Sequence, residues 1–290
     1  MAGYIGGKAV NLSTSGADIG GTANLDIIDV DGAANFAADV TFADGADIIT
    51  ASAGTSNFRA GVNAGNSIAS GGNYNVVVGD EAGTALTTGD QNTILGYSAG
   101  VALTTGLRNT LLGSTAGDAL VGAERNTAVG YGALHTETEG DRSTAVGVFA
   151  LSTQNTTGGG NIYNTAVGYG AGNVITTGTS NTLIGGLAGD AITTGGSNVA
   201  VGTSALSANT TASNNTAVGY QAGYSNTTGT PNQAFGYQAL YTNTTGSDNN
   251  AFGYAALKLN TTGAANCAFG HVSLDANTTG GHNSGFGHVT

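Results

Sequence analysis

The stretch Asn215-Thr216-Ala217-Val218-Gly219-Tyr220-Gln221-Ala222-Gly223, followed by Asn226-Thr227-Thr228-Gly229, is one copy of a unit that recurs along most of the chain. Each unit opens on an anchor residue, and the fourth residue after every anchor is Gly. Successive anchors lie 17 residues apart, except for a first step of 18 and one step of 21 after Ser143. The anchors are Asn57, Asn75, Asn92, Asn109, Asn126, Ser143, Asn164, Asn181, Asn198, Asn215, Asn232, Asn249, Asn266 and Asn283. An internal repeat this regular decides the fold before any other feature does.

The period of 17 residues indicates one coil of a β-solenoid, because it is too short for a pair of helices. We predict two short strands and two turns in each coil. The Asn-Thr-Ala-Val-Gly-Tyr segment is rich in residues that favour strands, and the recurring glycines supply the positive φ that tight corners need. The expected fold is therefore all-β, a parallel β-solenoid (β-roll or β-helix) whose body covers residues 56–290, with about 13 coils and a partial terminal coil.

Stacked coils turn each position of the repeat into a column of side chains. The sequence predicts an amide ladder of anchor residues, of the kind seen in cross-β stacks. It also predicts a column of Phe235, Phe252, Phe269 and Phe286, and another of Tyr220, Tyr237 and Tyr254 continued by His271 and His288. Arg108, Arg125 and Arg142 also lie 17 apart, and we expect Glu124, Glu137, Glu139 and Asp141 to interleave with them.

Alternation along the strand divides each coil into two faces. Thr, Val or Phe, and Tyr at the first, third and fifth positions share one face, while Asn, Ala and Gly share the other. Only one of these faces can fill the interior of a thin coil, and the other would leave a long neutral stripe facing water. We therefore expect several parallel copies packed side by side, and we favour a homotrimer.

Composition excludes several classes of protein. The chain has 290 residues, 51 Gly, 8% charged residues and a formal net charge of −12. With only six Lys and Arg it has no basic surface for nucleic acid. No apolar run reaches the length of a membrane span, so membrane insertion is not expected. The single cysteine, Cys267, rules out an intrachain disulfide framework. The first residues do not have the pattern of a secretory signal.

Residues 1–55 differ from the rest, since the repeat is absent and seven of the eighteen acidic residues lie there. Residues 25–33 and 39–45 alternate apolar with polar residues and end near turn signals, which predicts short strands in a thin β shaft.

The repeats resemble those of tail fibres of marine bacteriophages, including cyanophages, on the motif Asn-Thr-Ala-Val-Gly-Tyr-Gln-Ala at 215–222. They are also similar to the β-roll heads of trimeric autotransporter adhesins. The opening Met-Ala-Gly-Tyr-Ile-Gly resembles the start of a phage tail fibre. The resemblance implies a homotrimeric virion fibre in which residues 1–55 form a shaft and attach to other tail proteins, and the solenoid presents an end to a host cell-surface receptor or glycan. It implies a location in the virion tail, extracellular after release.

Candidate site residues are few. His271, His282 and His288 gather near the C-terminus, and we hypothesise that they mark a receptor-binding surface. The sequence offers no catalytic set, metal motif or cofactor motif, so we expect a structural protein rather than an enzyme. Two other functions stay open: a bacterial surface adhesin head, and an ice-binding solenoid whose stacked Thr columns include Thr227 and Thr228.

Overall fold

A computed structural model describes residues 53–290. The predicted attachment and shaft segment therefore lies outside the described residues, apart from its last three. Residues 53–290 form strands joined by turns and bends and contain no helix. The strands are β1 (Phe58–Ala60), β2 (Val76–Val78), β3 (Thr93–Leu95), β4 (Thr110–Leu112), β5 (Thr127–Val129), β6 (Gly140–Asp141), β7 (Thr144–Val146), β8 (Gly160–Asn161), β9 (Thr165–Val167), β10 (Thr182–Ile184), β11 (Val199–Val201), β12 (Thr216–Val218), β13 (Asn232–Phe235), β14 (Asn249–Phe252), β15 (Cys267–Phe269) and β16 (Ser284–Phe286).

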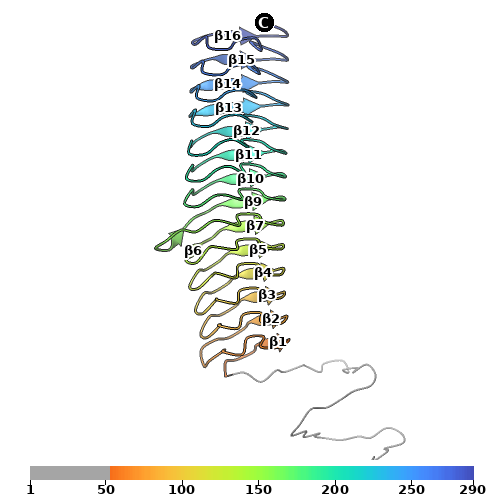
Figure 1. The fold of residues 1–290 in the computed structure, drawn as a ribbon, viewed down its shortest axis with the longest axis vertical. Coiled ribbons are helices and arrows are strands. Elements are labelled where there is room, and N and C mark those ends of the chain that lie inside the picture. The colour runs from red at the N-terminus through yellow and green to blue at the C-terminus, as the bar shows by residue number, and fades with distance from the viewer. Residues whose placement is uncertain (1–52) are drawn as a thin grey trace, which may run out of the picture. The chain divides into compact units, whose positions relative to one another are not determined.

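These residues form the predicted parallel β-solenoid, with coils stacked one upon the next (Figure 1). Fourteen strands make one continuous parallel sheet, and β6 and β8 make a separate pair. The register follows the repeat: β12 pairs with β13 through Thr216 and Gln233, which lie one repeat apart. The prediction of two strands in each coil is wrong, because each regular coil has one strand, which begins at the anchor or at the residue after it. The other half of each coil is held to its neighbour by bonds between turns, such as that from the Thr244 amide to the Thr261 carbonyl (2.8 Å).

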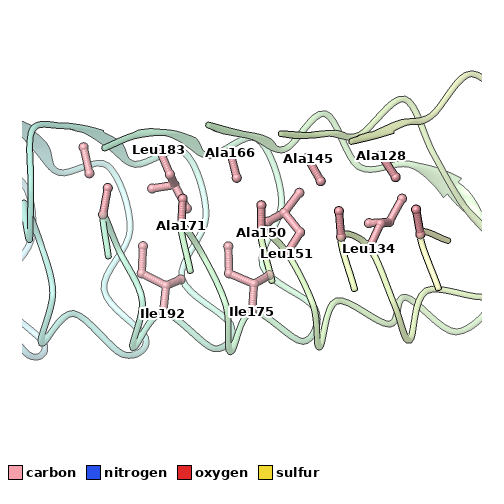
Figure 2. Packing of buried hydrophobic residues seen from close by; sticks show 14 of the residues in the cluster. Ala128, Leu134, Ala145, Ala150, Leu151, Ala166, Ala171, Ile175, Leu183 and Ile192 are labelled. Carbon is pink, nitrogen blue, oxygen red and sulfur yellow. The ribbon is translucent and has the colours of Figure 1, made fainter. Parts of the chain in front are cut away.

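The interior is filled by the face that carries the anchor and the second residue after it. Ala217 and Ala251 are fully buried at the second position, whereas their strand neighbours are partly exposed. Figure 2 shows Ala128, Ala145, Ala166 and Leu183 in one row, with Ile175 and Ile192 across the interior from them. The interior of a coil is so narrow that alanine fills it at many levels.

The eighth and eleventh residues after the anchor change in size along the solenoid. In many coils the eighth residue after the anchor is Gly and the eleventh is a fully buried Leu or Ile, as in the pairs Gly83 and Leu86, and Gly172 and Ile175. In later coils the large residue moves to the eighth position and the eleventh becomes Asn, as in the pair Leu257 and Asn260. The large apolar side chain thus moves to the eighth position, and the eleventh position becomes a buried amide that is hydrogen-bonded to its neighbours.

The anchor amides form the predicted ladder. The backbone N–H and the Nδ2 of Asn249 both donate to Oδ1 of Asn232, at 3.0 and 3.2 Å, and the same Nδ2 donates to the carbonyl of Gly263 (2.8 Å). Each anchor thus ties its coil to the preceding one and closes its own coil. A second ladder, which the repeat pattern had not led us to expect, joins the eleventh residues Asn209, Asn226, Asn243, Asn260 and Asn277. Buried amides persist in this interior because they are hydrogen-bonded.

The anchor ladder is interrupted at Ser143, and a nearby glutamine repairs it. Gln154 donates from Nε2 to Ser143 Oγ (3.0 Å) and accepts at Oε1 from Nδ2 of Asn164 (2.9 Å). The same Nε2 donates to Oε2 of Glu137 (3.0 Å), a fully buried carboxylate. Oε1 of Glu137 also accepts the amides of residues 138–140, at 3.0, 3.1 and 2.8 Å. Glu137 is thus an interior acceptor, so the prediction that it interleaves with the arginine column is wrong.

Candidate functional site

The outward face of the sheet is the most distinctive surface of residues 53–290. We call it the outer strip and define it as the first, third and fifth residues after each anchor from Asn92 onward. Its third column is Leu95, Leu112, Val129, Val146, Val167, Ile184, Val201, Val218, Phe235, Phe252, Phe269 and Phe286. The first column is mostly Thr as far as β12, and the fifth includes Tyr97, Tyr131, Tyr169, Tyr220, Tyr237 and Tyr254. All of these side chains point away from the interior, since the residue between the first and third columns is buried in every strand of the strip.

The corner that ends each strand is a glycine. Gly219 has φ +137°, and a Cβ placed on it would lie 2.4 Å from the carbonyl oxygen of Gly236 in the next coil. The same contact repeats along the column of fourth-position glycines. Close approach of successive corners requires glycine on steric grounds as well as conformational ones.

Aromatic rings stack along two columns of the strip, as predicted. Ring centroids of Phe235 and Phe252 lie 4.7 Å apart and those of Phe252 and Phe269 4.7 Å apart, with planes within 7°. The Tyr237 and Tyr254 rings lie 5.0 Å apart. Stacked rings cover each other's faces and leave their edges to solvent. Because the column lies outside the coil, its rings are not fully buried in the single chain: Phe252 is partly exposed and Phe269 is 38% exposed.

The outer strip carries no Asp, Glu, Lys or Arg between residues 93 and 288. Every such charged residue from Asp90 to the C-terminus instead lies between the ninth and sixteenth positions after an anchor, on the other sides of the coil or, for Glu137, in its interior. Leu95 and Ile184 are nevertheless 45% and 40% exposed. Acidic and basic side chains are therefore kept off a face that exposes apolar ones.

The three candidate histidines do not form one cluster. His271 and His288 continue the tyrosine column and stack at 4.7 Å with planes 1° apart, while the ring of Tyr254 lies 4.9 Å from that of His271. His282 precedes anchor Asn283 on a corner outside the strip, and its amide donates to the carbonyl of Ala264 (3.0 Å). All three are exposed. Within residues 53–290 no group of His, Cys, Asp or Glu is arranged to hold a metal ion.

The arginine column lies on the charged side of the coils. Arg125 Nη1 is 2.6 Å from Oε2 of Glu124, which bears out the predicted pairing for that residue. Arg108 instead donates from Nε to Oε1 of Gln91 (2.9 Å), and the Arg142 guanidinium lies 5.9 Å from the ring centroid of Tyr163. Separation of like charges is thus achieved by three different partners.

One further charged pair joins neighbouring coils. Nδ1 of His135 lies 2.5 Å from Oδ1 of Asp118, one repeat earlier. Burial raises the pKa of the Asp118 carboxyl above its ordinary 3.8, and the nearby His135 lowers it by a smaller amount. His135 therefore has a partner in the preceding coil, although nothing in its own repeat indicates one.

Sequence reasoning identified the columns but not the side of the coil on which they lie. One signal was present, because the fifth column includes Ser114, His271 and His288, which a narrow apolar interior would not accommodate unpaired. The second position, in contrast, is Val, Ile, Leu or Ala in every coil from Asn75 to Asn266. That contrast points to the second position as the interior one.

Comparison of the chain with protein-family models, curated proteins and solved structures found no match. Residues 53–290 contain no helix that could cross a bilayer.

Proposed function

We propose that this chain is a structural fibre protein of a bacteriophage tail, a rigid homotrimeric rod that presents a host-binding end. The observation that supports the proposal best is the continuous fourteen-strand sheet, in which each coil is bonded to the next through backbone and anchor amides. A stack of this kind extends by a fixed rise with each repeat, about 4.8 Å per coil. Such a body serves as a spacer, and we assign it no catalytic role and no cofactor.

In this proposal residues 1–55 attach the chain to other virion tail proteins, and the solenoid reaches outward to a receptor or glycan on the host surface. The aromatic end of the outer strip is the proposed receptor-binding region. There His271 stacks on His288, and Phe269 stacks on Phe286. Three copies would bind through three weak contacts whose effects combine by effective concentration. The protein would then reside in the virion tail and become extracellular on release.

Adsorption to host cells tests this function. The purified full chain, labelled with a fluorophore, is incubated with a panel of marine cyanobacteria and other marine bacteria. We expect saturable binding to a subset of strains. The double substitution His271→Ala and His288→Ala should reduce this binding at least tenfold, whereas Thr228→Ala, on an exposed corner, should not change it. Absence of binding to every strain, together with absence of fibres labelled by an antibody to this chain in phage lysates of those strains, would overturn the proposal.

A second candidate function is ice binding, which one observation favours. Strands β3, β4, β5, β7, β9, β10 and β12 present Thr in the first column and Val, Leu or Ile in the third, on one charge-free sheet face. The Thr columns suggested by the sequence are partly engaged elsewhere, since Thr227 Oγ1 donates to the Thr244 carbonyl (3.0 Å). Thermal hysteresis that is lost in Thr182→Lys but kept in Thr228→Lys would support this function, and its absence in the parent chain would exclude it.

A further inference from the structure

We infer that the outer strip from the coil of Asn92 to the coil of Asn249, short of the proposed receptor-binding end, is the surface through which copies of this chain associate, parallel and in register, with equivalent strands at the same height. This inference rests on the proposed homotrimeric fibre and adds which face forms the shared interface and how the copies are aligned.

The first argument is the mismatch between this face and water. Its third column is aliphatic or aromatic at every coil, with Leu95 and Ile184 at 45% and 40% exposure in the single chain. Isolated exposed apolar residues are common, but an unbroken column of apolar side chains over ten coils marks an interaction site.

The second argument is electrostatic. The chain places no Asp, Glu, Lys or Arg on the strip from residue 93 to residue 288, although such residues recur on the other sides of the same coils. A second copy would therefore approach this face without burying an unpaired acidic or basic side chain. A partner of strong charge would find no complementary group here, whereas another copy presents the same neutral surface.

The third argument is size. Ten coils at a rise of about 4.8 Å, and a width of four residue steps at about 3.3 Å each, give an area of about 600 Å² for this part of the strip on each copy. Stable specific interfaces bury about 1,200–2,000 Å² in total, which is about 600–1,000 Å² on each partner. The strip thus reaches the lower end of the range for an interface that holds copies together.

Register follows from the change of composition along the strip. The third column is aliphatic up to Val218 and aromatic from Phe235 onward, and the fifth column becomes continuously aromatic from Tyr220. In a parallel, in-register arrangement aromatic coils meet aromatic coils. A shift of one copy by one coil would place Phe235 against Val218 and leave one aromatic coil without an aromatic partner. The change from aliphatic to aromatic residues therefore favours the in-register arrangement over a shifted one.

Cross-linking at two positions of one coil tests the inference. Both variants carry Cys267→Ser, so that the introduced thiol is the chain's only one. One variant adds Val218→Cys, at the centre of the strip, and the matched control adds Thr228→Cys, on an exposed corner of the same coil. The full-length proteins are treated with the shortest bis-maleimide, and the mass of each untreated protein is measured by light scattering.

We expect untreated oligomers in both variants and cross-linked chains only with Val218→Cys. Antiparallel copies would separate the two introduced thiols by several coils and prevent this product. An oligomer that cross-links at position 228 alone, or at neither position, would overturn the inference but leave the fibre function standing. A monomer of 28.1 kDa would overturn the inference and the homotrimer together. Thermal hysteresis in that monomer would identify the strip as an ice-binding surface.

Discussion

Gly219 shows how strongly a single residue is constrained by the coil above it. Its φ of +137°, and the 2.4 Å that would separate a Cβ on this residue from the Gly236 carbonyl oxygen, leave no room for a side chain. We expect Gly219→Val to lower the free energy of unfolding by about 3 kcal/mol or more, because positive-φ strain and backbone displacement add. Thermal melting followed by circular dichroism measures the effect.

Gly186 provides the matched control for this prediction. It lies at the fifth position after its anchor, has nothing within 4 Å of a Cβ placed on it and does not occupy the left-handed region. Gly186→Val should therefore melt within a few degrees of the parent. Equal melting temperatures for the two variants would argue against the close-packed corner at Gly219.

Asp118 provides a pH-dependent prediction at the same scale. Burial raises the pKa of its carboxyl above 3.8, so the folded chain holds this proton more tightly than the unfolded chain does. The ionised carboxylate thus costs stability above the raised pKa, and the cost disappears as pH falls through that value and below 3.8. Asp118→Asn should melt higher than the parent at pH 7 and equally at pH 3. A lower melting temperature at pH 7 would mean that attraction to His135 outweighs burial.

At the scale of one coil, interior and outer columns should differ in their contribution to stability. Leu257 is fully buried, whereas Phe252 in the same coil is partly exposed and stacked between two rings. We expect Leu257→Ala to cost about 2–5 kcal/mol, and Phe252→Ala to cost about 1–2 kcal/mol through lost stacking in the single chain. Urea unfolding at protein concentrations where the chain is monomeric measures both. The reverse order would place the strip inside the coil.

The coil with 21 residues tests the repair of the anchor ladder. Gln154 links Ser143, Asn164 and Glu137 inside the solenoid. Gln154→Leu should lower the free energy of unfolding by about 2–3 kcal/mol, because buried polar groups lose their partners. Gln221→Leu, which removes only a half-buried bond from Gln238, should cost less than about 1 kcal/mol. Equal urea midpoints would show that the network around Ser143 is dispensable.

These elements also show how far the sequence could lead. The period, the corner glycines, the anchor ladder and the stacked aromatic columns follow directly from residues 17 apart, because stacking places equivalent residues in contact. The side on which Phe252 lies does not follow, since alternation shows only which residues share a face. The roles of Glu137 and Gln154 were hidden for a different reason, because their contacts depend on how the longer coil folds back.

At the scale of the whole solenoid, the 17-residue period repeats both the charge-free strip and the hydrogen-bonded interior in every coil. Each coil contributes a fixed rise, so length is proportional to repeat number, and the strip continues from coil to coil without a charged interruption. We propose that such a solenoid forms a fibre with its own copies through this strip. The proposed host-binding end and the proposed interface therefore occupy different stretches of the same periodic surface.

The most direct measurement is the distance between spin labels at Thr105→Cys and Thr228→Cys in a Cys267→Ser background. These residues share one exposed column and are separated by seven coils. Labelled chains are diluted with unlabelled chains, so that pulsed dipolar spectroscopy reports distances within one chain. Stacked coils predict one narrow distribution centred at about 34 Å, from a rise of about 4.8 Å per coil. A broad distribution, or a much shorter distance, would contradict the solenoid on which the proposed fibre depends.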